Sequence, residues 1–529
     1  MADIKITDPL GVEREYSTSK VGFNPVSGSE LAVFQEGGGG GHDYATEALL
    51  LEDRGMQGDY FNPDVRELAS AMSNNNRLTG ISLPNCESLP GWAFFSCSNL
   101  VFADFPVCKV IVNSAFANCQ KLSRLAFPAA EIIGDNVFNN VGSTLTSLVL
   151  ASTLKYVGDE NFYGKSRLLS NYNGIAYFGT AVVQSNWASV GNYVNGSIIS
   201  LRPDTTTLGK NAFNSRYNSS VTGIENTENV KYINDCAFSQ CSKLSFSDRA
   251  FPNCISVGFS AFTSCILQSE DNIGYVGDMA VKMYSSASMF SLRENTRVIA
   301  ASLFSFYGNS RLTAIEGIET VQHIGDYAFY GCSNLSNWGS YDLSALVTIG
   351  DYAFRNARVP SIINLANCEE LGVGAFAGCY SGGSKQLTTG PNVSHIPASA
   401  FAQCSLVEIN LPACARIDAY AFRSNTYLTT VSLPECLRVG SEAFKYAFSL
   451  ASIELPVCQE IFSGAFQSCS KLRSVYFPGS KVVWLETDNV FPYSFWTSGR
   501  VYVPESLVSK YKADLIWGLH SSRIYGITE

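Results

Sequence analysis

The sequence predicts a single solenoid of stacked coils, rich in parallel β-strands that are separated by turns. Three observations predict this fold class. The dipeptide Ala-Phe, or a close variant, returns along most of the 529 residues; a short alternating run ending in proline precedes many of these returns; and 46% of the residues are hydrophobic whereas only 16% are charged. Length alone would suggest three or four globular domains of ~100–200 residues each. The repeat overrides that estimate, because so short a unit buries its apolar side only against its neighbours.

Seventeen anchor residues define the period of the repeat. Successive anchors are 21 to 25 residues apart, except for two longer steps of 51 and 42 residues. The anchors are Met72, Phe94, Phe116, Phe138, Phe162, Phe213, Phe238, Phe262, Phe304, Phe329, Phe354, Phe376, Phe401, Phe422, Phe444, Phe466 and Phe491. We therefore expect repeats throughout residues 58–491.

Residues 406–422 illustrate one repeat, L-V-E-I-N-L-P-A-C-A-R-I-D-A-Y-A-F. In an extended chain Ile409 and Leu411 face one side and Asn410 the other, so the two aliphatic residues are expected to point inward. Pro412 ends the strand, because it has no N–H for a hydrogen-bonded ladder. The Ala-Phe pair that follows fits a short turn, or one helical turn, in which the Phe ring fills the space between coils.

The two longer steps contain related segments. Each holds a stretch with Tyr and Gly and then Ser-Leu-Arg, whose leucine, Leu201 or Leu292, lies twelve residues before the next anchor. We interpret each step as a normal repeat carrying an inserted β-hairpin, near residues 171–200 and 271–291. Insertions in solenoids map to loops on one face, often the binding face; the alternative is a surface elaboration without a function.

The two ends of the chain differ from the repeats. Residues 1–36 lack the pattern and are expected to form a small β element or a disordered arm, a module that could serve for attachment. Residues 37–57 begin with five glycines, which act as a flexible linker, and lead into the repeats. Residues 492–529 are expected to cap the last coil, with a helix that starts near Pro504.

Charge and hydropathy argue against several classes of protein. Thirty-six basic and 46 acidic residues leave a net charge of −10. This balance argues against a nucleic-acid partner, since phosphate binding needs clustered Lys and Arg. No stretch approaches 18 uninterrupted apolar residues, so we expect no membrane insertion. The N-terminus has no basic run followed by an apolar stretch and is not a secretory signal peptide as written.

Sixteen cysteines occur in the chain, and fifteen of them fall into two registers of the repeat. Eight follow an anchor Phe by three residues: Cys97, Cys119, Cys241, Cys265, Cys332, Cys379, Cys404 and Cys469. Seven follow the strand: Cys86, Cys108, Cys254, Cys368, Cys414, Cys436 and Cys458. Other repeats carry Ala or Asn in these registers. A cysteine of one register is replaced without replacement of a possible disulfide partner in the other register, which favours packed free thiols. Disulfides between some of them remain the alternative.

Signals for catalysis or for a cofactor are absent from the sequence. The four histidines, His42, His323, His395 and His520, have no partner at ligand spacing, and no Cys-x-x-Cys pair suggests zinc. Adjacent glutamates on an extended chain face opposite sides, whereas glycoside hydrolysis needs two facing carboxyls ~5–10 Å apart. We therefore expect no enzyme, no cofactor and no metal.

The outward row of the strands is the best candidate for a functional surface. In the C-terminal half this row is polar and slightly acidic, and its one tyrosine could stack on a sugar or a peptide. The candidate ligand-binding residues are Glu408, Asn410, Ser432, Glu454 and Tyr476. The alternative is the ordinary solvated face of a sheet.

The repeat L-x-x-I-x-L-P-x-C-x-x-I-x-x-x-A-F-x-x-C resembles the BspA-type leucine-rich repeats of bacterial surface and phage-associated proteins. Residues 428–469, with Leu-Pro-Glu-Cys at 433–436 and Leu-Pro-Val-Cys at 455–458, match it closely, and so do residues 78–119. The resemblance covers roughly residues 58–529. It implies a leucine-rich-repeat solenoid with parallel strands on the concave face and short helical turns, and it implies recognition or adhesion. Extracellular members usually carry a signal peptide, which this sequence lacks.

These features together predict a non-enzymatic recognition protein. The preferred setting is a phage or prophage virion, in which the N-terminal module attaches a tail-associated receptor-binding protein to the particle. The alternative is a bacterial cell-surface adhesin that binds host or microbial ligands. In either setting the partner is a protein or glycan receptor on a cell surface, and the location is the virion or the extracellular surface. A homo-oligomer is a further expectation.

Overall fold

The computed structural model describes residues 4–7, 13–16, 58–61, 72–142, 144–151, 154–162, 168–172, 175–183, 197–214, 220–305, 311–338, 343–379 and 385–527. The predicted N-terminal module and linker, residues 1–57, lie outside these ranges, except for the backbone of β1 (Ile4–Thr7) and β2 (Glu13–Tyr16), which pair antiparallel. The chain divides into two units, residues 1–254 with 260–266, and residues 255–259 with 267–529.

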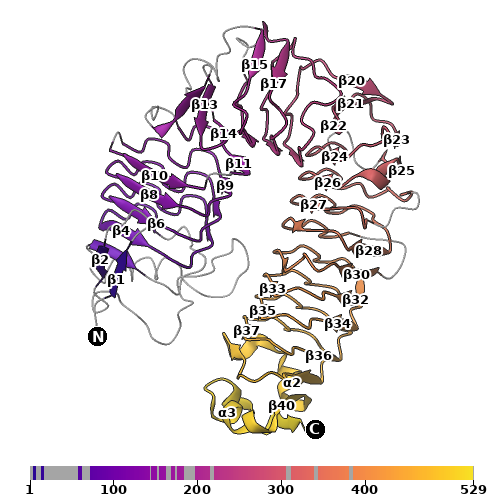
Figure 1. Cartoon of the computed structure of the whole chain (residues 1–529). Helices are drawn as coiled ribbons and strands as arrows, with labels where there is room; N and C mark the ends of the chain where they lie inside the picture. The colour runs from indigo at the N-terminus through magenta and orange to yellow at the C-terminus, as the bar shows by residue number, and fades with distance from the viewer. Residues whose placement is uncertain are drawn as a thin grey trace. The chain divides into compact units, whose positions relative to one another are not determined.

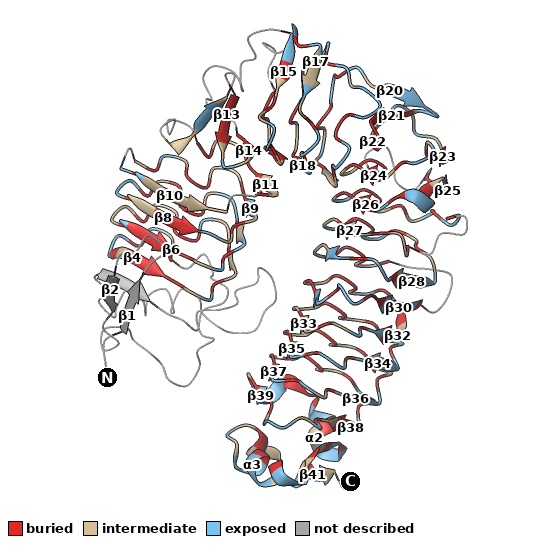
Figure 2. Ribbon diagram, in the orientation of Figure 1, coloured by how far each residue is buried: buried red, intermediate tan, exposed pale blue. Residues whose placement is uncertain are grey.

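A typical coil contributes one strand to each of two parallel ladders, which Figure 1 shows within each unit. The long-strand ladder of the first unit comprises β3 (Gly58–Phe61), β4 (Leu78–Ser82), β6 (Phe102–Asp104), β8 (Arg124–Phe127) and β10 (Ser147–Leu150), and later β15 (Ile198–Ser200) with β17 (Gly223–Glu225). Its short-strand ladder comprises β5 (Ser88–Leu89), β7 (Val110–Ile111), β9 (Ile132–Ile133) and β11 (Tyr156–Val157), and later β16 (Thr207–Leu208) with β18 (Tyr232–Ile233). Both ladders contain buried residues (Figure 2), and their apolar side chains pack together in one core cluster.

The second unit repeats this plan. Its long strands are β23 (Met289–Ser291), β25 (Ala314–Glu316), β28 (Ile362–Leu365), β30 (Lys385–Thr389), β32 (Leu406–Asn410), β34 (Thr430–Ser432), β36 (Ser452–Glu454), β38 (Ser474–Tyr476), β40 (Arg500–Pro504) and β41 (Ile524–Ile527). Its short strands are β19 (Ser256–Val257), β24 (Val298–Ile299), β26 (His323–Ile324), β27 (Thr348–Ile349), β29 (Glu370–Leu371), β31 (His395–Ile396), β33 (Arg416–Ile417), β35 (Arg438–Val439), β37 (Glu460–Ile461) and β39 (Trp484–Leu485). Two short 3-10 helices, η5 (Ile318–Thr320) and η6 (Asp488–Val490), lie in connections.

Two antiparallel segments interrupt the parallel coils. In one, β12 (Ser170–Tyr172), β13 (Ile175–Phe178) and β14 (Ala181–Val182) form a meander, and β14 joins the short-strand ladder beside β16. In the other, β20 (Gln268–Glu270), β21 (Ile273–Val276) and β22 (Met279–Met283) do the same beside β24.

Both antiparallel segments contain the same internal clamp. The guanidinium of Arg202 lies 4.6 Å from the ring centroid of Tyr177, and that of Arg293 lies 4.6 Å from the ring of Tyr275. Each arginine also donates its backbone N–H to the hydroxyl of the same tyrosine at 2.9 Å. These contacts therefore hold each antiparallel segment against the chain that follows it.

The Ala-Phe segments are turns that link each coil to the next. The backbone N–H of Phe94 donates to the carbonyl oxygen of Ala115 at 2.8 Å, and Trp92 and Ser96 donate to the next coil in the same way. Trp92 and Ser96 both have a φ of 58°, a left-handed conformation that is uncommon outside glycine. In the second unit, successive anchor Phe rings stack from residue 304 to residue 491, with centroids 4.9 to 5.6 Å apart.

All sixteen cysteines lie among the described residues and are free thiols. In the register after the anchor, the thiol donates to the anchor carbonyl of the preceding coil, as Cys119 does to Phe94 at 3.0 Å. In the register after the strand, it donates to the carbonyl two residues ahead, as Cys414 does to Arg416 at 3.2 Å. Cys236, which fits neither register, directly precedes an Ala-Phe pair and has a φ of 53°.

The last coil is closed by helices and two further long strands. α2 (Tyr493–Ser498) precedes β40, and η7 (Glu505–Leu507), α3 (Val508–Ala513) and η8 (Trp517–Arg523) separate β40 from β41. Trp517 is fully buried and donates its indole N–H to the carbonyl of Val483 at 2.7 Å. The buried Tyr511 accepts the N–H of Val483 on its hydroxyl at 3.0 Å. The cap is therefore anchored to the segment directly before β39, the last short strand.

Lys385 occupies a core position at the start of β30. It pairs in the ladder with Leu406 of β32, and its relative exposure is 0%. Its ammonium group has no hydrogen-bond partner in the described structure. Burial lowers the pKa of Lys385, against the opposing effect of the neighbouring thiols Cys379 and Cys404. An unpaired ammonium in the core destabilises the fold.

We predict that thiol titration separates the folded from the unfolded protein. Burial raises the pKa of thiols such as Cys97, Cys108 and Cys241 to about 12, so almost no reactive thiolate exists near pH 8. Rapid labelling of the native protein should reach at most the half-buried Cys236. Unfolding in guanidinium without a reductant should release all sixteen thiols; a lower count would mean that disulfides exist.

The variant Lys385→Met should be more stable than the natural protein. Removing an unpaired buried polar group is worth about 1–3 kcal/mol, and methionine fills a similar volume. Because the folded pKa lies below the ordinary value of 10.5, the penalty is complete below the folded pKa and disappears as pH rises towards 10.5. The melting-temperature gain over the natural protein should therefore shrink as the pH is raised. The exposed Lys471→Met is the control, and an equal gain there would contradict the assignment.

Candidate functional site

The five predicted binding residues lie on the outward side of the long-strand ladder of the second unit. Asn410 of β32 pairs with Ser432 of β34, and Glu454 of β36 pairs with Tyr476 of β38. Glu408 lies in the neighbouring outward row, where its carboxylate accepts a hydrogen bond from the side-chain amide of Gln386 at 3.0 Å. Tyr476 is half-buried and the other four are exposed.

Two further tyrosines extend this row beyond Tyr476. In the ladder Tyr476 pairs with Tyr502 of β40, which pairs with Tyr525 of β41. The rings of Tyr476 and Tyr502 are stacked at 4.7 Å with an angle of 9°, and those of Tyr502 and Tyr525 are 6.0 Å apart. The guanidinium of the exposed Arg500 lies 5.4 Å from the ring centroid of Tyr525. We call Tyr476, Tyr502, Tyr525 and Arg500 the tyrosine row.

The sequence contains a signal for the missed members of this row. Val501, Tyr502 and Val503 alternate inward and outward, as in the repeats. Because the repeats are predicted to end at residue 491, this alternation is assigned to the cap and its outward tyrosine is overlooked.

Stacking within the row determines which parts of each tyrosine ring a ligand can contact. Tyr502 has a neighbouring ring on each side, and Tyr476 has one face against Tyr502. A sugar that stacks on an aromatic residue needs a free ring face, which Tyr502 in the middle of the row does not offer; a cation lies at the Tyr525 end. Tyrosine and arginine are the residues most enriched, with tryptophan, among the energetically dominant positions of protein–protein interfaces. The arrangement therefore suits a protein partner better than stacking on a sugar.

The short-strand ladder of the same unit carries charges that are already paired. The carboxylate of Asp418 lies 2.7 Å from a ring nitrogen of His395 and 2.7 Å from Nε of Arg416. Burial alone would raise the pKa of Asp418, but these two partners lower it below its ordinary value. Arg438 packs its guanidinium 4.3 Å from the ring centroid of Phe462. These side chains are engaged with one another, which makes this ladder a weaker candidate for binding.

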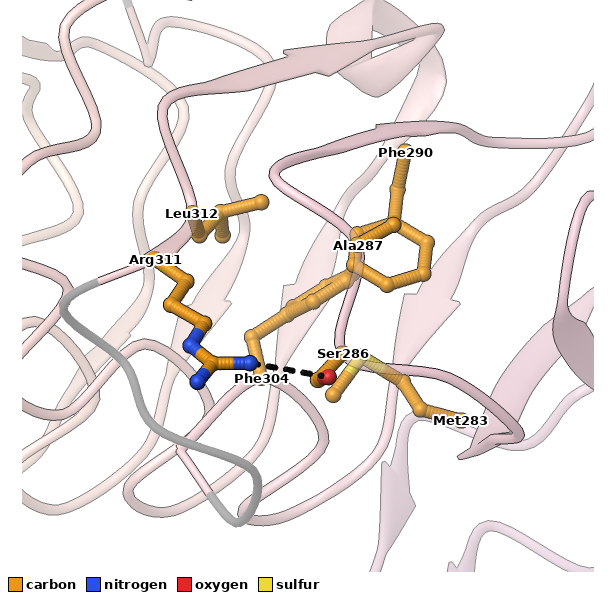
Figure 3. A pocket seen from close by; sticks show the side chains of 7 residues that line it. All are labelled: Met283, Ser286, Ala287, Phe290, Phe304, Arg311 and Leu312. Atoms are coloured by element: carbon orange, nitrogen blue, oxygen red, sulfur yellow. Dashed lines mark hydrogen bonds between the residues drawn. The ribbon is translucent and has the colours of Figure 1, made fainter.

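A small recess next to the second antiparallel segment is not a ligand site. It is lined by Met283, Phe290, Phe304 and Leu312, with Arg311 and Ser286 in contact at 3.5 Å (Figure 3). Its volume of about 10 Å³ is room for a single water at most.

The described histidines are placed for packing or ion pairing. His323 is buried and shares a hydrogen bond of 2.9 Å with Thr348, and burial, assisted by Arg297, lowers the pKa of His323 to about 4. His520 stacks on the ring of Trp496 at 3.8 Å. The fourth, His42, lies outside the described residues. Within the described ranges, no group of three or more His, Cys, Asp or Glu side chains is placed to hold a metal ion.

The part of the chain that the structure describes has no helix of the length and hydropathy needed to cross a bilayer.

The fold is that of a leucine-rich-repeat solenoid, in which parallel coils share one continuous core. The sequence profile of the BspA-type leucine-rich repeat region, of six copies, matches residues 67–175, 206–336, 302–427 and 394–491. These matches cover well over half of the 529 residues, and the chain belongs to this family. The prediction of family and fold class is thus confirmed.

Solved structures of bacterial leucine-rich-repeat proteins are similar to the chain at low identity. A protein from Bacteroides ovatus is 18% identical with 88% of each chain covered and a TM-score of 0.33. The pneumococcal vaccine antigen PcpA is 14% identical, with 89% and 83% covered and a TM-score of 0.22. A leucine-rich cell surface protein from Faecalibacterium prausnitzii is 13% identical, with 80% and 79% covered and a TM-score of 0.18. None of the curated proteins matches the sequence.

Proposed function

We propose that this chain is a non-enzymatic recognition protein that binds a protein on a cell surface through the tyrosine row. The single observation that carries the proposal is the alignment of three tyrosines and an arginine on an outward sheet face. Side chains already stacked on one another lose little conformational freedom on binding, which favours affinity. The BspA-type family supports an adhesion-type surface protein.

A cell-surface adhesin is the setting that we favour. The virion setting expected from the sequence rested on an attachment module at residues 1–36, which lies almost wholly outside the described residues. Family membership supports a surface protein without any need for that module. A protein receptor is favoured over a glycan, because Tyr502 has one face stacked on Tyr476 and the tilted ring of Tyr525 on its other side.

Binding of the full chain to intact mammalian epithelial cells and to bacterial cells tests the proposal. We expect Tyr502→Ala and Arg500→Gln each to weaken binding at least tenfold, about 1.4 kcal/mol, without a change in melting temperature. Tyr427→Ala is the matched control, because Tyr427 is 62% exposed and lies outside the row.

Treatment of the cells separates the two kinds of receptor. Protease digestion of the surface should abolish binding, whereas glycosidase digestion should not. Binding that survives protease treatment, or that is unchanged in both row variants, would count against a protein receptor at this site.

A further inference from the structure

A recess of about 340 Å³ lies where the chain crosses from β38 to β39. Leu455, Phe477 and Val483, each 1% exposed, lie beneath it, and the exposed Leu437, Val457 and Lys481 lie at its mouth. The volume lies at the lower end of the range of pockets that enclose small organic ligands. All of these residues belong to the second unit and lie within the described ranges.

The recess exists because the segment that connects the long strand β38 to the short strand β39 is longer than the equivalent segment between β36 and β37. Leu455 and Ile461 are six residues apart, whereas the equivalent Phe477 and Leu485 are eight apart, and Ile461 pairs with Leu485 in the ladder. At Gly479 the longer crossing passes close over the preceding coil, since a Cβ there would lie 2.6 Å from the carbonyl oxygen of Pro456. The two extra residues then leave space above the preceding coil.

The far wall of the recess is held in place by the cap. Val483 donates its N–H to the hydroxyl of Tyr511 at 3.0 Å and accepts the indole N–H of Trp517 at 2.7 Å. Both aromatic side chains are fully buried. A pocket whose wall is fixed in this way is available without rearrangement, which lowers the entropic cost of binding.

The chemistry of the lining selects a specific kind of occupant. Leu437 is 40% exposed and Val457 is 38% exposed, so two aliphatic side chains face solvent at the mouth of an apolar cavity. Lys481, which is also exposed, is the one charged residue among those that line the recess. An apolar group is thus favoured against Leu437 and Val457, and an anion beside Lys481.

We infer that the recess receives a bulky apolar side chain of the protein partner, with an acidic residue beside it that pairs with Lys481. The inference rests on the proposed function, because the recess and the tyrosine row lie at the same end of the second unit, next to the cap. A buried anchor side chain in a pocket, surrounded by contacts that exclude water, is the usual source of affinity in protein interfaces.

N-acetyl-L-tryptophan and its neutral amide serve as probes in ligand-observed NMR titrations of the full chain. Both carry an indole, and only the first carries a carboxylate. We expect the acid to bind at least threefold more tightly than the amide. Lys481→Gln should remove that difference, and Val457→Trp should abolish binding of both by filling the mouth.

Matched controls are available within the chain. Val107→Trp places the same substitution in an identical Pro-Val-Cys sequence of the first unit, where Val107 is 40% exposed. Lys471→Gln removes an exposed lysine that does not line the recess. Neither control should change the binding of either probe.

Three outcomes would overturn the inference: neither probe binds, binding survives Val457→Trp, or the acid and the amide bind equally to the natural protein. Its failure can be distinguished from failure of the proposed function. If Tyr502→Ala weakens binding to cells while neither probe binds, the tyrosine row stands and the recess does not. If Val457→Trp abolishes probe binding and Tyr502→Ala leaves binding to cells unchanged, the recess stands and the proposed row does not.

Discussion

The hydrogen bond between the anchor phenylalanine of one coil and the next coil is the interaction on which the rest of the structure depends. Phe94 donates its N–H to the carbonyl of Ala115, and the carbonyl of Phe94 accepts both the N–H of Cys97 and the thiol of Cys119. The small alanine lets the two backbones approach, and the stacked ring fills the space beside them. Strands at both sides of the coil then lie in register, because the turn fixes the distance between coils.

The geometry of this turn also explains why a single cysteine is replaced in some coils while the cysteines of neighbouring coils remain. Asn425 stands where other coils have cysteine, and its amide donates to the carbonyls of Phe401 at 2.9 Å and Phe422 at 2.8 Å. Its side-chain oxygen also accepts the N–H of Leu406 at 3.0 Å. The position requires a small side chain, since Ala357 and Ala447 occupy it in other coils. A thiol or an amide there adds a second hydrogen bond, to the anchor carbonyl of the preceding coil.

The candidate site arises where the repeat meets its cap. A regular ladder places side chains of adjacent coils beside one another, so like residues in one register form a continuous row. Tyr476 comes from the repeats, whereas Tyr502 and Tyr525 come from the strands that the cap adds to the ladder. The recess lies at the same end, where the crossing that leads to Trp484 is two residues longer than its neighbour. Departures from strict repetition thus supply the features that distinguish one coil from another.

The sequence by itself determined the period and the inward residues, because each depends on a local pattern that recurs every 21 to 25 residues. It also placed Glu454 and Tyr476 on the outward row. Only the tertiary structure decided that a coil carries two strands, that Tyr502 and Tyr525 extend the row, and that Lys385 is buried with no hydrogen-bond partner among the described residues. These features depend on which residues of neighbouring coils are opposite one another, and that register is set by backbone contacts between residues distant in sequence.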